Sequence, residues 1–313
     1  MEQTALDEQR RPTSCVRRAR WDGQTVYIKR YSIGDWGRTE EVVRARLGRE
    51  CRLVRRMHES GFFGGRLGLV KVLEADLDSC TLVTAEARGR PLGELVLSRF
   101  QGRSARQALA AMFLAGRWLR QFQQVVADED DAVPISDYDP LDMVAYCRFR
   151  LEKMREVGYR WPDRQLEQAI CGRVGELLAQ STDGDRRLVW THADYAPGNI
   201  IWDGRVLTPI DFGMAHLDRP LVDVTYFIHR LEMQRVYRPW RRWPIGLWRR
   251  AFLRGYGRPD AENSPMYQAC MIRHLICRVL TYVRRPPRDL KQKLHDKWVR
   301  GCVRRRIAAL CTR

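Results

Sequence analysis

Three polar side chains follow one another at short intervals in the segment 191–213, which is THADYAPGNIIWDGRVLTPIDFG. Asp194 is an acid of the kind that orients a hydroxyl group. Asn199 and Asp211 carry oxygen atoms of the kind that bind Mg²⁺ beside a nucleotide. Phosphoryl transfer needs such parts, because it depends on positioning and charge neutralisation more than on covalent chemistry. The spacing therefore indicates phosphoryl-transfer chemistry.

The residues between Asn199 and Asp211 predict how these two side chains come together. The segments 199–202 and 205–210 favour β-structure, and the Asp-Gly pair between them is a strong hairpin turn. A hairpin brings its two ends side by side, so we expect both side chains at its open end. Taken singly, each polar residue is better explained as a turn residue or a helix cap. The complete set in this context favours a metal site.

At these residues the chain resembles the aminoglycoside phosphotransferase and choline kinase family of the protein-kinase-like superfamily, and the resemblance extends over residues 24–257. It implies an α+β, two-lobed fold, with a small antiparallel-sheet N-lobe, a larger and mainly helical C-lobe, and ATP in the cleft. It further implies Asp194 as the catalytic base, and Asn199 and Asp211 as Mg²⁺ ligands. Asp223 would brace the catalytic loop or cap a helix, and His192 would be a structural residue of that loop.

The N-terminal segment fits the same fold. Residues 14–21 and 24–31 predict two strands joined by a tight turn, and Lys29 lies on the second. In the superfamily a lysine on this strand holds the α and β phosphates of ATP, which makes Lys29 a catalytic and nucleotide-binding candidate beside Asp194 and Asn199. A lysine in this position alone would more often be a solvated residue at a strand edge.

A helix is predicted over residues 39–58, and one acid stands on its apolar face. Glu50 occupies the same stripe as the apolar residues, and a carboxylate on a buried face requires a partner. The resemblance supplies Lys29 as that partner. The alternative is an exposed ion pair of Glu50 with Arg46 or Arg49. The apolar members of the stripe are Val43, Leu47, Val54 and Met57.

Two further strands, 69–76 and 81–86, lead to a segment that resembles the hinge between the lobes. Backbone groups of Glu86 and Ala87 would meet the adenine there. One feature departs from the superfamily: no G-x-G-x-x-G precedes Lys29. The loop that covers the phosphates is therefore expected to be short, divergent or missing.

The resemblance places the N-lobe in residues 1–86 and the C-lobe in residues 87–313. Helices are predicted over residues 105–128, 141–157 and 164–181. The last two form an insertion typical of this family, where it helps to build the acceptor pocket. The apolar face of the first helix is expected to contain Leu109, Phe113, Leu119 and Phe122.

Length and composition exclude several classes of protein. A chain of 313 residues can bury the core of a two-lobed enzyme, and it contains no apolar run long enough to span a bilayer. It begins without an apolar signal segment. Nine cysteines without a C-x-x-C pair indicate reduced thiols in a cytoplasmic protein.

Almost all of the net charge of +18 lies in the last quarter of the chain. Residues 235–313 contain 21 Lys and Arg against 4 Asp and Glu, with tryptophans interleaved. This pattern suits an anionic membrane surface, a phosphorylated glycan or, less favourably, a nucleic acid. The alternative is a solvated basic surface whose tryptophans anchor the core. Because such a surface repels cations, an anionic acceptor is favoured over a cationic aminoglycoside.

The sequence thus predicts an ATP- and Mg²⁺-dependent kinase that phosphorylates a hydroxyl group of a small molecule or a saccharide, including a lipid-linked one at the inner membrane face. Two alternatives stay open. A non-catalytic kinase-like binding module is favoured by the missing glycine loop and opposed by the complete Asp/Asn/Asp set. A nucleic-acid-binding protein on a kinase scaffold would bind DNA or RNA with a steep salt dependence.

Overall fold

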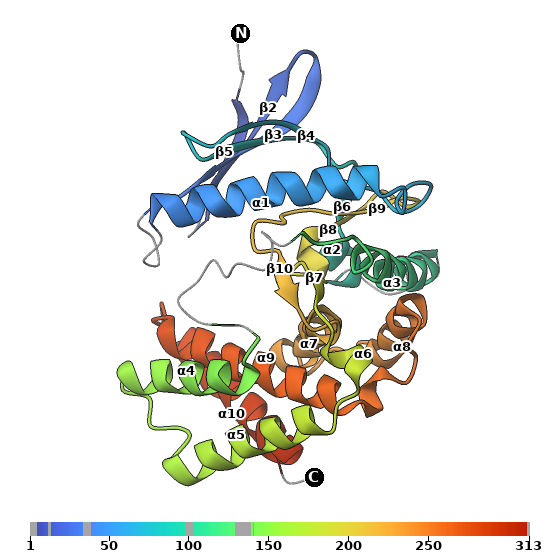
Figure 1. Ribbon diagram of the computed structural model, residues 1–313. Coiled ribbons are helices and arrows are strands. Elements are labelled where there is room, and N and C mark those ends of the chain that lie inside the picture. Colours follow the sequence, from blue (N-terminus) through green and yellow to red (C-terminus); the bar gives the residue numbers. More distant parts are fainter. Residues whose placement is uncertain are drawn as a thin grey trace.

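The protein folds into two lobes, a small one built on a sheet and a large one built mainly of helices (Figure 1). This architecture, seen here in a computed structural model, confirms the predicted α+β fold. The structure describes residues 5–11, 14–33, 39–97, 103–128, 139 and 141–311.

The N-lobe sheet has five antiparallel strands in the order β1-β2-β3-β5-β4. Both predicted N-terminal strands are confirmed. The strand β1 was not predicted, because its sequence, ALDEQRR, is too polar to resemble a strand. It pairs with β2, and residues 12 and 13 between the two strands lie outside the described residues. The strands are β1 (Ala5–Arg11), β2 (Ser14–Trp21), β3 (Gln24–Tyr31), β4 (Val72–Asp76) and β5 (Thr81–Ala85).

The helix α1 (Glu40–Glu59) lies beneath this sheet (Figure 1). Thr39 caps its first turn by accepting a hydrogen bond from the Val42 N–H. The negative charges of Glu40 and Glu41 lie in the first turn, where they interact favourably with the positive end of the helix dipole. The predicted apolar stripe is buried, and Glu50 is buried with it at 4% exposure. The helix therefore carries one acid into the interior between the lobes.

Short strands build the floor of the cleft. The chain crosses from β5 into β6 (Arg90–Pro91), and β6 pairs with β8 (Ile200–Trp202), which pairs in turn with β9 (Leu207–Pro209). The predicted hairpin is confirmed, although its return strand begins later than expected. Asp203 accepts hydrogen bonds from the N–H groups of Arg205 and Val206, which holds these residues in the turn. A second small sheet pairs β7 (Val189–Thr191) with β10 (His216–Asp218).

The C-lobe helices that the sequence predicted all form, with shorter bounds at most ends. The first, α3, ends at Phe122 rather than at residue 128, and it crosses α8 closely. A Cβ atom at Gly116 would lie 2.0 Å from the Phe252 carbonyl oxygen, so this crossing requires glycine. The helices are α2 (Leu92–Leu97), α3 (Arg103–Phe122), α4 (Met143–Glu156), α5 (Arg164–Ala179) and α6 (Asp183–Arg186).

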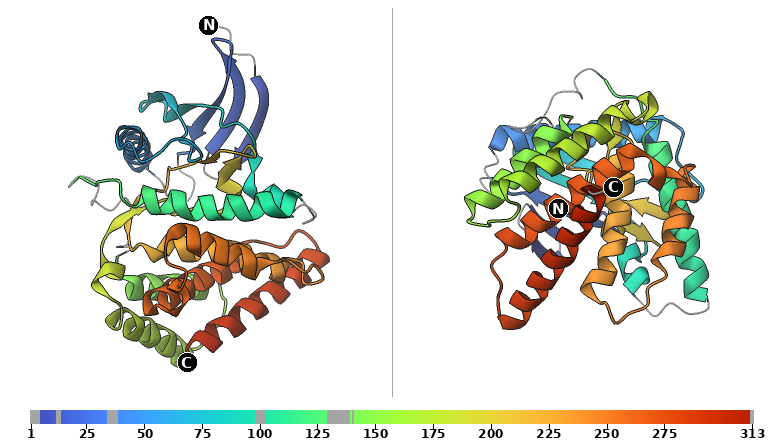
Figure 2. Two further views of the ribbon diagram at one scale, coloured as in Figure 1. Left: turned by 90° about the vertical axis from the view of Figure 1, so that its right-hand side faces the viewer. Right: turned by 90° about the horizontal axis from the view of Figure 1, so that it is seen from below.

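From Leu221 onward the chain is mainly helical and forms α7, α8, α9 and α10 (Figure 2). Seen from below, α9 and α10 cross the base of the C-lobe. Within the described residues, no helix is both long enough and apolar enough to cross a membrane. The helices are α7 (Leu221–Tyr237), α8 (Ile245–Tyr256), α9 (Pro265–Arg284) and α10 (Leu290–Cys311).

The core corrects one expectation about apolar side chains and shows where the tryptophans of the basic quarter lie. Phe113 was predicted on the buried face of α3 but is 43% exposed, because α8 approaches the α3 backbone at Phe113 so closely that Gly255 must face it. The tryptophans of the basic quarter divide into two kinds. Trp243 and Trp248 are buried and anchor the core, whereas Trp240 is 76% exposed.

Candidate active site

The catalytic loop follows β7 and is held by an acid from α7. Oδ2 of Asp223 accepts a hydrogen bond of 2.6 Å from the His192 N–H, and Oδ1 accepts one of 3.0 Å from the Ala193 N–H. Ala193 has a φ of 62°, an unfavourable conformation for alanine that these bonds stabilise. Burial raises the pKa of Asp223, an effect that His192 and the two backbone N–H groups oppose. Asp223 therefore lies where a brace for the loop was expected.

The ring of His192 also contributes to the loop. Its Nε2 lies 3.0 Å from the Ile210 carbonyl oxygen, and the ring packs 4.7 Å from that of Phe212. The next aromatic residue of the loop, Tyr195, is fully buried, and its hydroxyl donates to the Ala115 carbonyl of α3. These contacts fix the loop against the core, so His192 occupies a structural position.

Asp194 is held by donors on both carboxylate oxygens. The Asn199 amide donates to Oδ2 at 2.7 Å, and the Tyr226 hydroxyl donates to Oδ1 at 2.8 Å. Tyr226 lies on α7, three residues after Asp223, so one turn of helix contacts both the backbone and the acid of the loop. The sequence analysis missed Tyr226. Its position three residues after the bracing acid is the signal that would have found it.

The hairpin brings Asn199 and Asp211 to one end of the cleft. Ile200 pairs with Pro209, and the Ile210 N–H donates to the Asn199 carbonyl at 2.9 Å. Both side chains line the same cavity. Because the Asn199 NH₂ group faces Asp194, its amide oxygen is left for a cation.

This donor set fits Mg²⁺ better than a metal that requires several protein ligands. Within the described residues, no group of three or more His, Cys, Asp and Glu side chains is placed to hold a metal. Mg²⁺ is usually bound through one or two protein oxygens, with water and substrate phosphates completing its coordination. The side-chain oxygens of Asn199 and Asp211 fit this requirement.

Lys29 faces Asp211 across the cleft, and the two side chains form an ion pair. Burial alone disfavours the ammonium group, but Tyr31, Glu50 and Asp211 together raise the pKa of Lys29 above its ordinary value. Lys29 is therefore a cation at the roof of the cleft. A cation in that position neutralises phosphate charge.

The expected ion pair between Lys29 and Glu50 is not formed. Glu50 instead accepts hydrogen bonds from the Tyr31 hydroxyl and from the Phe212 N–H, the latter at 3.0 Å. Lys29 turns to Asp211, which offers a charge closer to the cleft. Burial raises the pKa of Glu50, an effect that Lys29, Tyr31 and the Phe212 N–H oppose. Glu50 thus connects α1 to β3 and to the segment after Asp211.

The cavity between the lobes has a volume of about 310 Å³. Val16, Val70, Leu82 and Ile201 contribute apolar surface above and below it. At its hinge edge, Arg18 of β2 forms an ion pair of 2.8 Å with Glu86. A cavity with apolar walls, lined also by a lysine and by the side-chain oxygens of Asn199 and Asp211, suits a nucleotide with its phosphates beside these polar groups.

The sequence matches the model of the phosphotransferase enzyme family over residues 20–269. The chain belongs to this family. Among curated proteins, no sequence matches this phosphotransferase.

Solved structures with the same fold come from two branches of kinases. A thermostable mutant of the aminoglycoside phosphotransferase APH(4)-Ia, in a ternary complex with ADP and hygromycin B, is similar with a TM-score of 0.63 and 14% identity, over 99% of this chain and 93% of that one. A choline/ethanolamine kinase family protein from Mesorhizobium loti has a TM-score of 0.57 and 14% identity, over 100% and 93% of the two chains. At such identities the likeness shows the fold alone.

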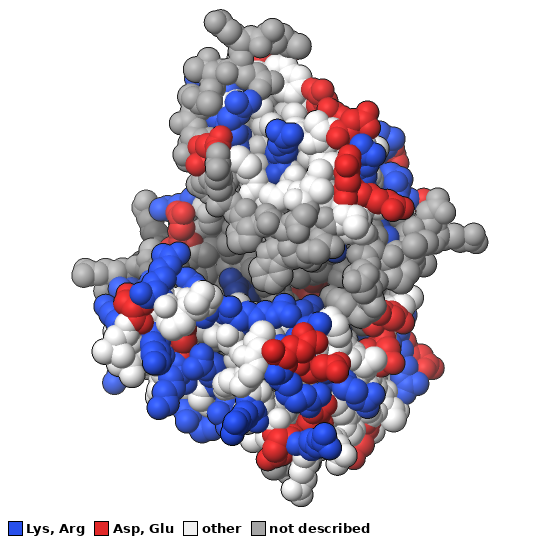
Figure 3. Space-filling model, turned by 90° about the vertical axis from the view of Figure 1, so that its left-hand side faces the viewer, with Lys and Arg blue, Asp and Glu red and all other residues white. Residues whose placement is uncertain are grey.

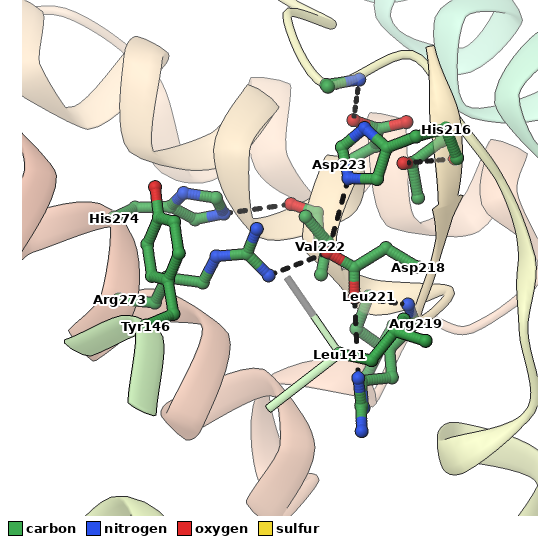
Figure 4. Close-up of polar contacts among 12 residues, drawn as sticks. Leu141, Tyr146, His216, Asp218, Arg219, Leu221, Val222, Asp223, Arg273 and His274 are labelled. Carbon is green, nitrogen blue, oxygen red and sulfur yellow. Dashed lines mark hydrogen bonds and ion pairs between the residues drawn. The ribbon is translucent and has the colours of Figure 1, made fainter. Parts of the chain in front are cut away.

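A buried ion pair joins α9 of the phosphotransferase to the end of β10 (Figure 4). Arg273 of α9 donates to Oδ2 of Asp218 at 2.7 Å, and both side chains are almost fully buried. The Arg273 guanidinium also lies 4.5 Å from the centre of the Tyr146 ring. Burial would raise the pKa of Asp218, but Arg273 and His216 hold it well below its ordinary range. The pair connects α9, α4 and the end of β10, the strand that pairs with β7.

Proposed function

We propose that the protein is an ATP- and Mg²⁺-dependent phosphotransferase that phosphorylates the hydroxyl group of a small molecule or a saccharide. One observation carries this proposal: Asp194, doubly hydrogen-bonded, lies in the loop that joins β7 to the hairpin presenting Asn199 and Asp211, with Lys29 opposite. These are the four groups that phosphoryl transfer requires.

Each residue has a role that its contacts support. Asp194 accepts the proton of the acceptor hydroxyl as the acceptor oxygen forms its bond to the γ-phosphorus and the bond to ADP breaks. Lys29 neutralises charge on the α and β phosphates, and Glu50, held by Tyr31, positions the segment around Asp211. Asn199 and Asp211 would hold Mg²⁺, which supplies charge neutralisation at the phosphates. Backbone groups of Glu86 and Ala87 at the hinge edge would meet the adenine.

Two arginines near Tyr226, the tyrosine that contacts Asp194, support an anionic acceptor: burial raises the Tyr226 pKa, and the charges of Arg230 and Arg278 both act to lower it. The Arg230 guanidinium lies 6.0 Å from the centre of the Tyr226 ring, whose hydroxyl contacts Asp194. Arg278 donates to Nε2 of the buried His229 at 3.3 Å. In the part of the chain that the structure describes, neither arginine has a carboxylate within ion-pair distance. Two guanidinium groups near Tyr226 without a described carboxylate partner favour an acceptor whose alcohol is close to a phosphate or a carboxylate.

A screen of ATP consumption in the presence of Mg²⁺ tests the proposal. Matched pairs of neutral and phosphorylated sugars, together with aminoglycosides and glycolipids, serve as acceptors. Asp194→Asn keeps the shape of the side chain and removes the basic group, so kcat should fall by about 10²–10⁴-fold with little change in ATP affinity. The exposed Asp183→Asn is the matched control. ATP consumption by Asp194→Asn at the wild-type rate would contradict the assignment.

The class of acceptor is tested separately, by comparing KM for the acceptor with KM for ATP. Arg230→Gln and Arg278→Gln should raise KM for a phosphorylated sugar and leave KM for ATP unchanged. If the neutral member of each pair is phosphorylated as well as its phosphorylated partner, the acceptor is not selected by charge. The kinase assignment would then stand without that feature.

A non-catalytic binding module is the second candidate. Arg11 pairs with Ser14, and the sequence contains no glycine before Gly23, so the N-terminal hairpin lacks the glycine-rich loop that covers the phosphates in protein kinases. Binding of ATP without turnover in the presence of any acceptor would favour this module. The cytoplasmic location of the protein stays a prediction from its cysteines.

A further inference from the structure

We propose that the outer face of α10 docks the protein onto an anionic lipid bilayer. Three large apolar side chains are exposed on this helix: Leu290 at 71%, Leu294 at 60% and Trp298 at 47%. They follow one another at intervals of four residues, which places them in a row along one side of an α-helix. This row is called the α10 stripe below.

The α10 stripe lies opposite the side of the helix that packs on the protein. Val299, Val303 and Ile307 are buried against the core, and they face away from the stripe by helical geometry. The helix is therefore apolar on two sides, and the described residues of the chain cover only one of them. A contiguous apolar row rimmed by charge is typical of an interaction surface.

The tryptophan of the stripe is held in place. Its indole N–H donates to the Val236 carbonyl of α7 at 2.9 Å, and the Arg305 guanidinium lies 6.0 Å from the centre of its ring. Trp298 thus presents a ring to the solvent without freedom to turn inward. Tryptophan is enriched where one side of a residue meets hydrocarbon and the other meets water.

Cationic side chains surround the α10 stripe. Residues 284–300 contain seven Lys and Arg but only two acids, Asp289 and Asp296, and Asp296 is buried. Figure 3 faces the end of the molecule where α9 turns into α10, and it shows Lys and Arg side chains gathered below the cleft. Six of these basic residues are exposed, and none forms an ion pair with a described residue: Arg284, Arg285, Arg288, Lys291, Lys293 and Lys297.

An anionic bilayer satisfies both features of this surface, whereas a nucleic acid satisfies only one. Lipid head groups neutralise the lysines, and the acyl boundary takes up the leucines and the tryptophan edge. A nucleic acid duplex would pair with the lysines and leave a row of leucines against its charged backbone. The lysines and the leucines are interleaved along the first two turns of the helix, which suits the boundary between head groups and acyl chains.

Co-sedimentation of the full chain with vesicles tests the proposal at low salt. The protein should bind vesicles of phosphatidylcholine mixed with phosphatidylglycerol, bind pure phosphatidylcholine poorly, and dissociate as salt is added. Lys293→Gln with Lys297→Gln should weaken binding by about 10- to 30-fold, because each cation near the leaflet contributes severalfold. Leu290→Gln with Leu294→Gln should weaken it by about tenfold.

Matched controls separate the α10 stripe from general charge and hydrophobicity. Arg52→Gln with Arg55→Gln changes the charge by the same amount on the exposed side of α1. Leu77→Gln with Leu188→Gln removes two exposed leucines elsewhere. Both control variants should bind vesicles as the wild type does.

Three results would overturn the proposal: equal binding to neutral and anionic vesicles, equal loss of binding in the control variants, or tighter binding to DNA or RNA than to anionic vesicles in the same buffer. Because vesicle binding requires no turnover, these results are independent of the proposed kinase activity.

Discussion

The Tyr226 hydroxyl donates a hydrogen bond of 2.8 Å to Oδ1 of Asp194, while the Asn199 amide occupies Oδ2. The carboxylate is therefore fixed in rotation before any substrate binds. A base held in this way loses no orientational freedom when it meets the acceptor hydroxyl. Burial, followed by the charge of Asp194, raises the pKa of Tyr226, so the phenol stays protonated and remains a donor.

Tyr226→Phe removes one of the two donors and leaves the ring in place. We expect kcat to fall by about tenfold, because a hydrogen bond to a charged group is lost and the carboxylate can rotate. KM for ATP should not change, since Tyr226 does not line the nucleotide cavity. Steady-state kinetics with the acceptor found in the screen measure both values. The control is Tyr256→Phe, which loses a buried hydrogen bond to Gln123 and should affect stability alone.

Gly213→Ala tests the contact between α1 and the segment after Asp211. A Cβ atom at Gly213 would lie 2.5 Å from the Tyr31 hydroxyl and 3.2 Å from Glu50 Oε2. The methyl group should displace Tyr31 from Glu50 and lower kcat/KM for ATP by about tenfold or more. Tyr31→Phe removes the oxygen that the new methyl group would meet. The double variant Gly213→Ala with Tyr31→Phe should therefore lose less kcat/KM for ATP, as a free energy, than the sum of the losses in the two single variants. Strict additivity in this double-mutant cycle would contradict the contact.

Asp218→Asn should destabilise the protein by about 3–5 kcal/mol, because Arg273 would remain buried without its partner charge. Chemical denaturation measures this loss. A second change, Arg273→Met, should recover part of it in the double variant. Since the pKa of Asp218 lies below its ordinary value in the folded state, the stability it contributes is present above about pH 4 and is lost on acidification. Asp218→Asn should accordingly be less sensitive to acid below that pH.

Burial, together with the charge of Arg273, lowers the pKa of His274 to about 3, whereas its unfolded value is near the ordinary 6.5. The unfolded chain therefore binds a proton that the folded chain excludes. The stability that His274 contributes should be fully present above about pH 6.5 and should fall by about 1.4 kcal/mol per pH unit below it. The buried His229, whose pKa is also lowered, adds a loss of the same sign. His274→Gln should therefore reduce the slope between pH 6.5 and 5 without removing it. Thermal denaturation across this range measures the slope.

The sequence alone predicted the parts of the site that are close together along the chain. Asp194, Asn199 and Asp211 lie within one loop and one hairpin, so turn chemistry and β-propensity place them without knowledge of distant segments. The helix α1 and the burial of Glu50 were predictable for the same reason, because a period of 3.6 residues determines which side chains share a face.

The tertiary structure decided which of these residues touch one another. The partner of Glu50 is Tyr31 rather than Lys29, because the hydroxyl of β3 reaches the buried carboxylate while the longer lysine extends to Asp211. The spacing along the sequence places Tyr226 on the same helix face as Asp223, but it does not show that the Tyr226 hydroxyl reaches Asp194. A contact between two side chains from separate elements depends on how those elements pack, and no local pattern encodes that distance.

For the basic residues 235–313, too, the sequence determined one property and the tertiary structure another. Its charge is a property of the sequence, and composition alone predicted a preference for anions. Which tryptophans anchor the core and which reach the solvent depended on the packing of α7, α8 and α10. Burial of Trp243 and Trp248 and exposure of Trp298 follow from contacts between helices, because the hydrophobic effect drives apolar residues inward without specifying which of them the fold can cover.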